Sequence, residues 1–361
     1  MKKLLLAEVA VLLVLVVVAV FVRVGIFRVP EPELDVPDQS QSTSAPTDAD
    51  TQTQPPTQPP TDPPTEPPSD APVISTAPPT EPTLPPTEPE GPGIPAEGVT
   101  LSAKRYFVYD VERDRFLAIS GSENNPVYPA SITKLFSAYV ALQYLDPETV
   151  ITAGDELDLV RPGSSLAYIK KGHRLRVDML VEGMLLPSGN DAAYILAAAA
   201  ARAASGNPNM RAQAAIDYFV KMMNTTAVSM GMTGSHFRNP DGYHEIDHYT
   251  SCHDLTIIAK LALSSDVIMR YAGTVRDDVR FESGETIEWN NTNQLIDRSS
   301  NYYCDNAIGL KTGTTDAAGN CLLSAFQEKD GIYIIGVFGC KERADRFKDT
   351  RKLYWTLVCD D

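Results

Sequence analysis

The pattern of apolar and polar positions divides the chain into three parts. From Leu4 to Val22 every residue except Glu8 is apolar, which makes a run of 19 residues after two lysines. The following stretch is dominated by proline, threonine and acidic residues, and patterns typical of folded structure begin only after it. We therefore expect three regions, over residues 1–29, 30–97 and 98–361.

The third region begins and ends with strand patterns around a helical middle. Short apolar or alternating runs predict strands over residues 106–111, 115–119, 307–315, 321–326 and 332–338. Apolar residues at helical spacing predict helices over residues 132–142, 179–186, 192–204 and 345–358. Polar residues 112–114 and Lys329-Asp330-Gly331 are typical of hairpin turns. The order predicts an α+β domain in which an antiparallel sheet of about five strands pairs both ends of the region and helices pack on it.

The N-terminal apolar run is long enough to cross a bilayer as a helix. A cleaved signal peptide is the alternative, because its apolar core needs only about 7–15 residues, which the stretch from Val9 to Val22 also satisfies. No small residues suited to cleavage follow, since Arg23 and Val24 come next. The sequence favours an uncleaved single-pass anchor over residues 1–29.

Residues 30–97 hold 21 of the 28 prolines and 13 acidic residues, but no lysine or arginine. Proline fixes φ and removes a hydrogen-bond donor, so helices and sheets are disfavoured here. We expect a disordered, polyproline II-biased stalk that extends at ~3.1 Å per residue and spaces the folded domain from a membrane. Passive disorder and a proline-rich ligand for another protein are the alternatives.

The charge is uneven along the chain. The stalk supplies −13 of the net −16 and residues 1–29 about +3, which leaves roughly −6 for residues 98–361. An acidic domain repels phosphates, which excludes a basic nucleic-acid-binding surface. The 264 residues of the folded region are enough for one bilobed domain with a sizeable core.

The first candidate cluster is Ser131-Ile132-Thr133-Lys134, at the start of a predicted helix. Residues three apart share a helix face, so the Lys134 amine can meet the Ser131 hydroxyl. If burial lowers the pKa of the amine, it can take the hydroxyl proton and make Ser131 a nucleophile. An isolated serine and lysine at this spacing are more often a helix start beside a surface lysine.

The second cluster, Ser188-Gly189-Asn190-Asp191, lies between two predicted helices, where Asp191 could simply cap the second helix. The third, Lys311-Thr312-Gly313-Thr314-Thr315, lies on a predicted strand. An ammonium and hydroxyls there can hold a carboxylate, and Gly313 would let a substrate backbone approach closely. The alternative is an edge strand that a lysine protects from aggregation.

Together these clusters resemble the S-x-x-K, S-x-N and K-T-G motifs of penicillin-recognising serine acyl-transferases. Their surroundings most resemble the D-alanyl-D-alanine carboxypeptidases of peptidase family S11, in PASITK (129–134), LLPSGNDAA (185–193), HYTSCHDL (248–255) and GLKTGTTDAAGNCL (309–322). Residues 163–165, 239–242 and 291–293 are similar as well. The resemblance covers about residues 100–358. It implies a β-lactamase/transpeptidase-like fold, with a sheet flanked by helices and an all-α subdomain.

The resemblance implies a role for each motif residue. Ser131 would attack the carbonyl between two terminal D-alanines with Lys134 as general base, and the backbone N–H groups of Ser131 and Thr314 would bind the oxyanion. Ser188 would relay a proton to the leaving amine, and Asn190 would hold the substrate amide. The substrate-binding residues would be Lys311, Thr312, Gly313, Thr314 and, on a looser local match, Arg346.

The implied partners are a peptidoglycan stem peptide that ends in D-Ala-D-Ala, β-lactams as acylating inhibitors, and the membrane through the N-terminal helix. The acyl peptide would lie beside strand 307–315 as an added strand. Many family members carry a C-terminal β-domain and an amphipathic tail, and neither follows here, so we expect an N-terminal anchor and an extracytoplasmic domain. No cofactor or metal is implied, because the five histidines (173, 236, 244, 248 and 253) lack metal-ligand spacing. His248 and His253 are expected to be structural or surface residues.

Three alternatives to a carboxypeptidase remain. A DD-endopeptidase or transpeptidase shares every motif. A β-lactamase needs a deacylating carboxylate, and no E-x-x-x-N element lies between Ser188 and Lys311. A catalytically silent wall-binding module would not need the intact serine and lysine motifs.

The chain has five cysteines, an odd number. A Cys304–Cys321 disulfide would close a loop around the strand that carries Lys311. The favoured interpretation is that these cysteines are buried thiols, because Cys321, Cys340 and Cys359 lie in apolar runs.

Overall fold

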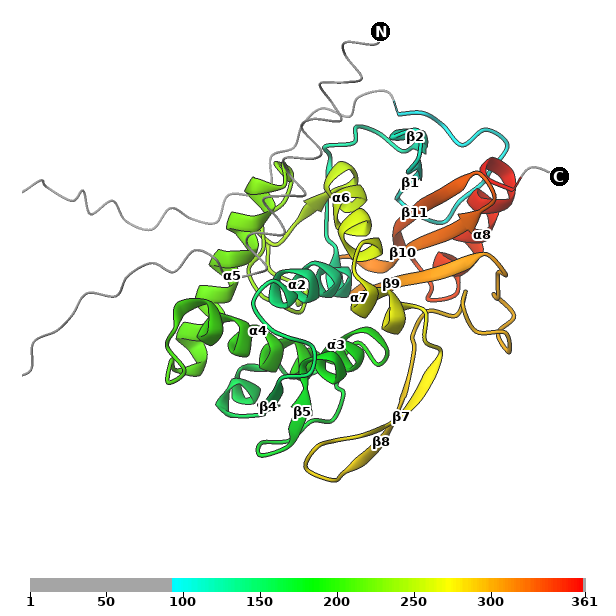
Figure 1. Ribbon diagram of the computed structural model, residues 1–361. Helices are drawn as coiled ribbons and strands as arrows, with labels where there is room; N and C mark the ends of the chain where they lie inside the picture. The colour runs from blue at the N-terminus through cyan, green and yellow to red at the C-terminus, as the bar shows by residue number, and fades with distance from the viewer. Residues whose placement is uncertain (1–92, 360–361) are drawn as a thin grey trace, which may run out of the picture. The chain divides into compact units, whose positions relative to one another are not determined.

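The computed structural model describes residues 93–359 (Figure 1). The predicted anchor over residues 1–29 and the predicted stalk up to residue 92 lie outside the described residues. Among the helices of residues 93–359, none combines the length and the apolarity that a bilayer crossing requires.

A five-stranded antiparallel sheet forms one half of the domain, in the order β2-β1-β11-β10-β9. Its strands are β1 (Arg105–Asp110), β2 (Arg115–Ile119), β9 (Ala307–Thr315), β10 (Gly319–Glu328) and β11 (Gly331–Cys340). Strands from both ends of the domain pair directly, as Val108 faces Ile335 across β1 and β11. The predicted sheet is confirmed, and β9 is its edge strand.

Helices cover both faces of the sheet (Figure 1). Helix α8 (Asp345–Leu357) packs on one face, where Tyr354 stacks on Phe326 at 4.3 Å between ring centroids. The 3₁₀ turn η1 (Ala130–Ile132), α6 (Cys252–Leu263) and α7 (Asp266–Ala272) contact the other face. Because both faces are covered, β10 and β11 are rich in buried apolar residues, and β9 is buried along its middle although it carries Lys311 and three threonines.

The other half of the domain is a helical layer built around α4 (Asn190–Ser205). Its remaining helices are α2 (Thr133–Leu142), α3 (Val177–Leu185) and α5 (Ala212–Ser229). Twelve of the 16 residues of α4 are buried, since its alanines let α2, α3 and α5 pack closely around it. This packing fixes the start of α4, where Asn190 lies, relative to α2.

The helical layer also contains strands, so the predicted all-α subdomain is not purely helical. The short elements are β3 (Pro126–Val127) with β6 (Thr250–Ser251), β4 (Val150–Thr152) with β5 (Arg174–Arg176), β7 (Arg276–Arg280) with β8 (Thr286–Asn290), and the 3₁₀ helix η2 (Asp155–Leu159). Trp289 of β8 is buried and donates a hydrogen bond to the Ala167 carbonyl at 3.0 Å. Most of these strands are too short, at two or three residues, to give an alternating pattern.

All five cysteines have free thiols. Cys304 packs in the hydrophobic cluster under α8, whereas Cys321 belongs to the cluster on the opposite side of the sheet. The alternative of a Cys304–Cys321 disulfide is therefore wrong, because the sheet separates the two side chains. Burial raises the pKa of the Cys304 and Cys321 thiols to about 11, so both remain protonated and pack as small apolar groups.

The contacts of the folded domain extend into residues 93–97, which the sequence assigns to the stalk. Ile94 forms an antiparallel bridge with Ile119 of β2, and the Ala96 N–H donates to the Tyr106 hydroxyl at 3.2 Å. The Ala96 side chain is buried in the cluster under α8. These residues add to the sheet edge opposite β9.

We predict that a chain beginning at Gly93 unfolds at a higher temperature than one beginning at Gly98. Losing the Ile94 bridge and the burial of Ala96 costs about 1 kcal/mol, or roughly 2–4 °C for a domain of this size. Thermal melts followed by circular dichroism test this, with penicillin acylation rates as the control that the β9 side of the sheet is unchanged. Equal melting temperatures would show that residues 93–97 add no stability.

Candidate active site

Ser131 and Lys134 lie side by side at the start of α2. Ser131 is in the 3₁₀ turn η1, and not in the first turn of the α-helix as the sequence predicts, because α2 begins at Thr133. The predicted contact is nevertheless made: the Lys134 Nζ donates a hydrogen bond to the Ser131 Oγ at 2.9 Å. The hydroxyl is held against the amine at the N-terminal end of α2.

The Lys134 amine has two further acceptors. It donates to the Asn190 Oδ1 at 2.7 Å and to the Asp241 backbone carbonyl at 2.8 Å. With Ser131, three acceptors match the three N–H groups of an ammonium. The Lys134 side chain has no exposed surface, so these contacts replace water completely.

Burial lowers the pKa of Lys134 to about 8, against the opposing attraction of Asp241 and Asp191. The Asp241 carboxylate is itself buried, which raises its pKa, and its Oδ2 has no partner among the described residues. With this pKa, about a tenth of Lys134 is neutral at pH 7, far more than for an exposed lysine. A neutral amine keeps two N–H groups for Asn190 and Asp241 and turns its lone pair to Ser131.

Two glycines clamp the turn that carries Ser131. A Cβ on Gly242, where φ is +80°, would lie 1.9 Å from the Ala130 carbonyl oxygen. A Cβ on Gly313 would lie 2.8 Å from the Pro129 oxygen and 3.2 Å from the Ser131 nitrogen. The sequence predicts that Gly313 makes room for a substrate backbone, but the space where its Cβ would lie is filled by the turn that carries Ser131.

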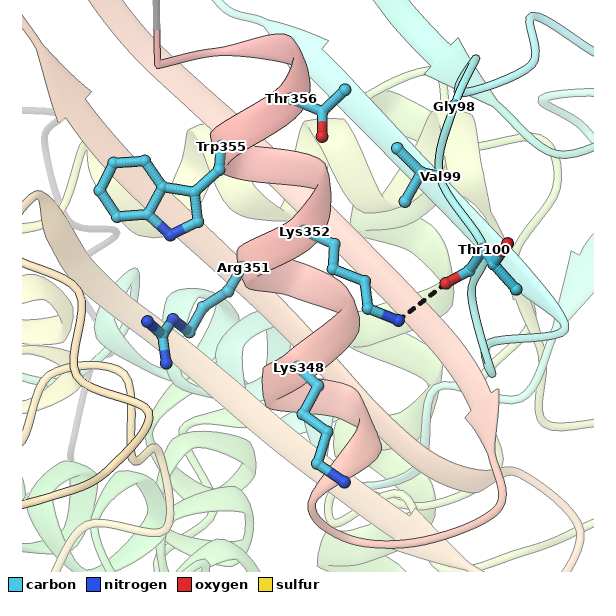
Figure 2. Close-up of a pocket in the computed structure, with 8 residues that line it drawn as sticks. All are labelled: Gly98, Val99, Thr100, Lys348, Arg351, Lys352, Trp355 and Thr356. Atoms are coloured by element: carbon cyan, nitrogen blue, oxygen red, sulfur yellow. Dashed lines mark hydrogen bonds between the residues drawn. The ribbon is translucent and has the colours of Figure 1, made fainter. Parts of the chain in front are cut away.

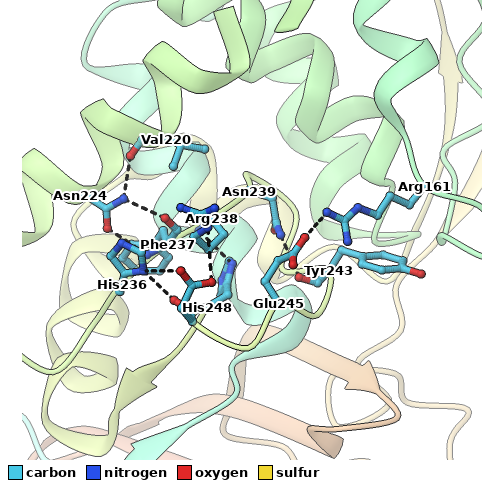
Figure 3. A network of polar contacts seen from close by, with 11 residues as sticks. Arg161, Val220, Asn224, His236, Phe237, Arg238, Asn239, Tyr243, Glu245 and His248 are labelled. Carbon is cyan, nitrogen blue, oxygen red and sulfur yellow. Dashed lines mark hydrogen bonds and ion pairs between the residues drawn. The ribbon is translucent and has the colours of Figure 1, made fainter. Parts of the chain in front are cut away.

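The Gly242 side of the clamp is a loop braced by polar contacts (Figure 3). The Asn239 side chain spans the loop, since its Nδ2 donates to the Tyr243 carbonyl at 2.9 Å and its Oδ1 accepts from the Gly242 N–H at 2.8 Å. Arg161 forms an ion pair with Glu245 and lies 4.8 Å from the centroid of the Tyr243 ring. This bracing fixes the position of the Asp241 carbonyl, which accepts a hydrogen bond from Lys134.

Asp191 and Ser164 hold Asn190 in place. The Asp191 carboxylate accepts from the Ala192 N–H in the first turn of α4 at 2.9 Å, and also from the backbone N–H groups of Ala167 at 2.8 Å and Ile169 at 3.0 Å. It thereby ties the 164–169 segment to the start of α4. From that segment the Ser164 Oγ accepts from the Asn190 Nδ2 at 2.9 Å, which turns the Asn190 Oδ1 toward Lys134.

The motif on β9 contributes a row of polar groups beside the clamp. The Thr312 and Thr292 hydroxyls are hydrogen-bonded at 2.6 Å. The Arg346 Nη1, from the first turn of α8, donates to the Thr314 Oγ1 at 3.1 Å and to the Gly313 carbonyl at 3.4 Å. The structure thus brings Arg346 to the predicted motif on β9.

Ser188 is placed differently. It lies in the connection between α3 and α4, is buried, and adopts φ of +63°, a conformation that is strained for a residue with a side chain. Within residues 93–359 no hydrogen bond joins its hydroxyl to Ser131 or Lys134. Asn190 is therefore hydrogen-bonded directly to Lys134. Within residues 93–359, Ser188 makes no such contact with the Ser131–Lys134 pair.

Two buried basic groups border this cluster, and neither has a carboxylate partner among the described residues. The Lys311 Nζ has only the Thr312 carbonyl as an acceptor, at 3.2 Å, and the Arg346 Nε has no acceptor among the described residues. Burial, together with the positive charges of Lys134 and Arg346, lowers the pKa of Lys311. Burial lowers the pKa of Arg346 to about 10, so Arg346 stays charged at neutral pH. The site lacks one negative group, which an anionic ligand can supply.

The histidines take no part in this cluster. His248 is buried, and its Nδ1 accepts from the Arg238 N–H at 3.3 Å, so its Nε2 donates to the Thr133 hydroxyl at 2.9 Å. Burial lowers the pKa of His248 to about 3, which keeps it neutral, and the prediction of a structural role is confirmed. No cluster of three potential metal ligands occurs in the described part of the chain.

The family of this chain follows from its similarity to known proteins. The family model described as D-alanyl-D-alanine carboxypeptidase, peptidase S11, matches residues 92–342, which is more than half of the chain. This chain belongs to the S11 D-alanyl-D-alanine carboxypeptidase family. The S11 family resemblance of the serine, asparagine and lysine motifs is thereby confirmed.

The chain is similar to several characterised members of the S11 family and its relatives. It is 29% identical to D-alanyl-D-alanine carboxypeptidase DacF of Bacillus subtilis over 251 residues, 67% of this chain and 59% of DacF. The crystal structure of the Streptomyces K15 DD-transpeptidase matches with a TM-score of 0.64 and 25% identity, over 72% of this chain and 97% of that chain. Penicillin-binding protein D2 of Listeria monocytogenes in its ampicillin-bound form shares the fold, with a TM-score of 0.59 and 24% identity over 72% and 99%. The chain thus spans about three fifths of DacF.

We predict that Gly313→Ala slows acylation of Ser131 far more than it destabilises the protein. The added Cβ must displace the Ser131 turn, and a displacement near 1 Å costs a rate factor of about 100. Stopped-flow acylation by a chromogenic penicillin, with thermal melts in parallel, measures both effects. Val337→Ala, which opens a buried site on β11, is the control that loses stability but keeps the acylation rate. A normal rate in the Gly313 variant would contradict the clamp.

The acylation rate should rise with pH up to about 8. Lys134 must be neutral to accept a proton, and with its pKa at about 8 the neutral fraction falls about tenfold per pH unit below that value. Second-order acylation rates between pH 6 and pH 10 test this, with circular dichroism at each pH to show that the fold persists. A flat profile between pH 6 and pH 8 would remove Lys134 as the base.

Proposed function

We propose that this chain is a serine-type D-Ala-D-Ala carboxypeptidase. It removes the terminal D-alanine from peptidoglycan stem pentapeptides through an acyl-enzyme on Ser131, and β-lactams acylate the same serine. The observation that carries this assignment is a serine hydrogen-bonded to a buried lysine of lowered pKa, bordered by two buried basic groups that have no carboxylate partner among the described residues. A nucleophile beside basic groups that can bind an anion suits a peptide that ends in a free carboxylate.

The Lys134 contacts support a role as general base. When neutral, it accepts the Ser131 proton as the Oγ attacks the carbonyl carbon, and the ammonium that forms regains its third donor bond. The charge on the ammonium is stabilised by the Asn190 Oδ1 and the Asp241 carbonyl, which are already in position. Little rearrangement is needed during the proton transfer.

The clamp supports an oxyanion site made of the backbone N–H groups of Ser131 and Thr314. Gly313 holds β9 against the Ser131 nitrogen, so the next residue of the strand, Thr314, is close to the nucleophile. Two fixed N–H donors stabilise the negative charge of the tetrahedral intermediate. The Arg346 bond to the Thr314 hydroxyl steadies this part of the strand.

Edge strand β9 supports the binding of an extended acyl peptide as an additional strand. The terminal carboxylate would be held by Lys311 and Thr312, with Arg346 adding positive charge behind Thr314. Asn190 would hold the substrate amide with the second N–H of its Nδ2, since Ser164 takes only one. Ser188 would carry the proton to the leaving amine.

A DD-transpeptidase is the second candidate, favoured by the match to the Streptomyces K15 enzyme over nearly its whole length. The two activities share the acyl-enzyme and differ only in whether water or an amine attacks it. Further proposals concern the parts outside residues 93–359. We propose that residues 1–29 anchor the protein in the cell membrane, with the catalytic domain extracytoplasmic on the stalk, because a D-Ala-D-Ala substrate lies outside the cytoplasm.

We predict that Ser131→Ala abolishes both covalent labelling by a fluorescent penicillin and release of D-alanine from a pentapeptide. Ser264→Ala, at an exposed serine on the end of α6, is the matched control and should retain both. Labelling of the Ser131 variant would overturn the nucleophile assignment. Mass spectrometry of the products separates the candidates: a tetrapeptide indicates a carboxypeptidase, and a cross-linked dimer with added amine acceptor indicates a transpeptidase. Rapid release of hydrolysed penicillin would indicate a β-lactamase. If the native chain is not labelled at all, the result would indicate a catalytically silent module.

A further inference from the structure

A groove of about 630 Å³ lies along the exposed side of α8 (Figure 2). Helix α8 packs on the face of the sheet opposite η1, the turn that carries Ser131. One wall is residues 98–100, and the other is α8. The α8 residues that line the groove are Lys348, Arg351, Lys352, Trp355 and Thr356. None of the lining residues is acidic. The groove is separate from the S11 motifs and from the reaction proposed above.

The groove combines positive charge with an exposed aromatic ring. Arg351 donates to the Asn301 carbonyl at 2.9 Å and has no carboxylate partner among the described residues. Lys348 and Lys352 form ion pairs with Asp345 and Asp349 along the helix, yet both lysine side chains remain about half exposed. Trp355 is 52% exposed, although tryptophan is usually well buried. Such a surface suits an acidic, proline-rich segment, because proline-rich ligands dock in aromatic-lined grooves.

We propose that the groove binds residues 81–92 of the same chain, EPTLPPTEPEGP. This segment carries three glutamates, Glu81, Glu88 and Glu90, five prolines and no basic residue. In the extended polyproline II form that its prolines favour, three residues make one turn, so Pro82, Pro85 and Glu88 lie along one side of the backbone. The prolines pack on Trp355 and the glutamates lie beside Arg351 and the lysines.

The position of the segment in the chain supports this occupant. Residues 81–92 immediately precede Gly93, and Gly93 is five residues from Gly98 at the edge of the groove. Five residues span at most ~18 Å, so residues just upstream reach the groove without any long loop. Tethering at this separation gives an effective concentration on the order of millimolar, which makes weak ionic and proline contacts sufficient.

Charge selects this site over the rest of the domain. Residues 98–361 carry a net charge of roughly −6, which repels the acidic stalk elsewhere. The groove offers Arg351, which has no carboxylate partner among the described residues, and the half-exposed Lys348 and Lys352, which also pair with Asp345 and Asp349. Binding there fixes the direction in which the stalk leaves the domain and shortens the distance over which the enzyme can reach. The interaction weakens as salt increases, because its ion pairs are exposed.

Tryptophan fluorescence of the full chain in detergent micelles tests the interaction. The chain has two tryptophans, and Trp289 is buried, so acrylamide quenching reports mainly on Trp355. Trp355→Phe gives the Trp289 background. The triple variant Glu81→Gln, Glu88→Gln, Glu90→Gln should show about twofold stronger quenching at low salt, since an uncovered indole is open to the quencher. In 1 M sodium chloride the native chain should approach the variant.

The matched control neutralises three acidic residues farther upstream, Asp48→Asn, Asp50→Asn and Asp62→Asn, and should quench like the native chain. Arg351→Glu should quench like the Glu81, Glu88, Glu90 variant. Equal quenching in all forms would overturn the interaction. So would protection of Trp355 that appears only when anionic lipid vesicles are added, which would assign the groove to a membrane surface. Penicillin labelling of Ser131 should be the same in every form, so failure here leaves the proposed activity untouched.

Discussion

The site depends on a lysine amine that is completely removed from water. A buried ammonium is costly unless every donor is satisfied, and here the three acceptors come from separate segments: Ser131 in η1, Asn190 at the start of α4, and the Asp241 carbonyl in a loop. The part of the desolvation cost that these acceptors do not offset lowers the pKa of Lys134 to about 8. Chemistry at Ser131 is therefore tied to the packing of α2, α4 and the loop that carries Asp241.

The three cations of the site are suited to different tasks. Lys134 lies next to Asp241 and Asp191, and its amine can lose a proton near neutral pH. Arg346 has no acidic partner in the described residues, yet a guanidinium does not deprotonate under ordinary conditions, so it keeps a fixed positive charge near Thr314. Burial lowers the pKa of Lys311, and the positive charges of Lys134 and Arg346 lower it further. An anionic ligand relieves the repulsion among all three groups, which favours its binding.

Much of the domain could be predicted from the sequence. The five main strands and the Ser131–Lys134 contact follow from short-range spacing, which the alternating and helical patterns preserve. The Asp241 carbonyl could not be found in this way, because a backbone acceptor has no side-chain signature. Asp191 looked like a helix cap, since only the fold brings the 164–169 segment to its carboxylate. The strands of the helical layer could not be predicted, because most are only two or three residues long and show no alternating pattern.

The clamp around Ser131 joins parts of the chain that are far apart in sequence. Gly242 and Gly313 press on the same turn from elements more than 100 residues downstream of it, and β9 is held by strands completed only near residue 340. A chain that has not yet closed its sheet therefore lacks a positioned nucleophile. Under the proposed function, an unfolded polypeptide would not react with a β-lactam at Ser131, and covalent labelling by an antibiotic would count only the molecules that have finished folding.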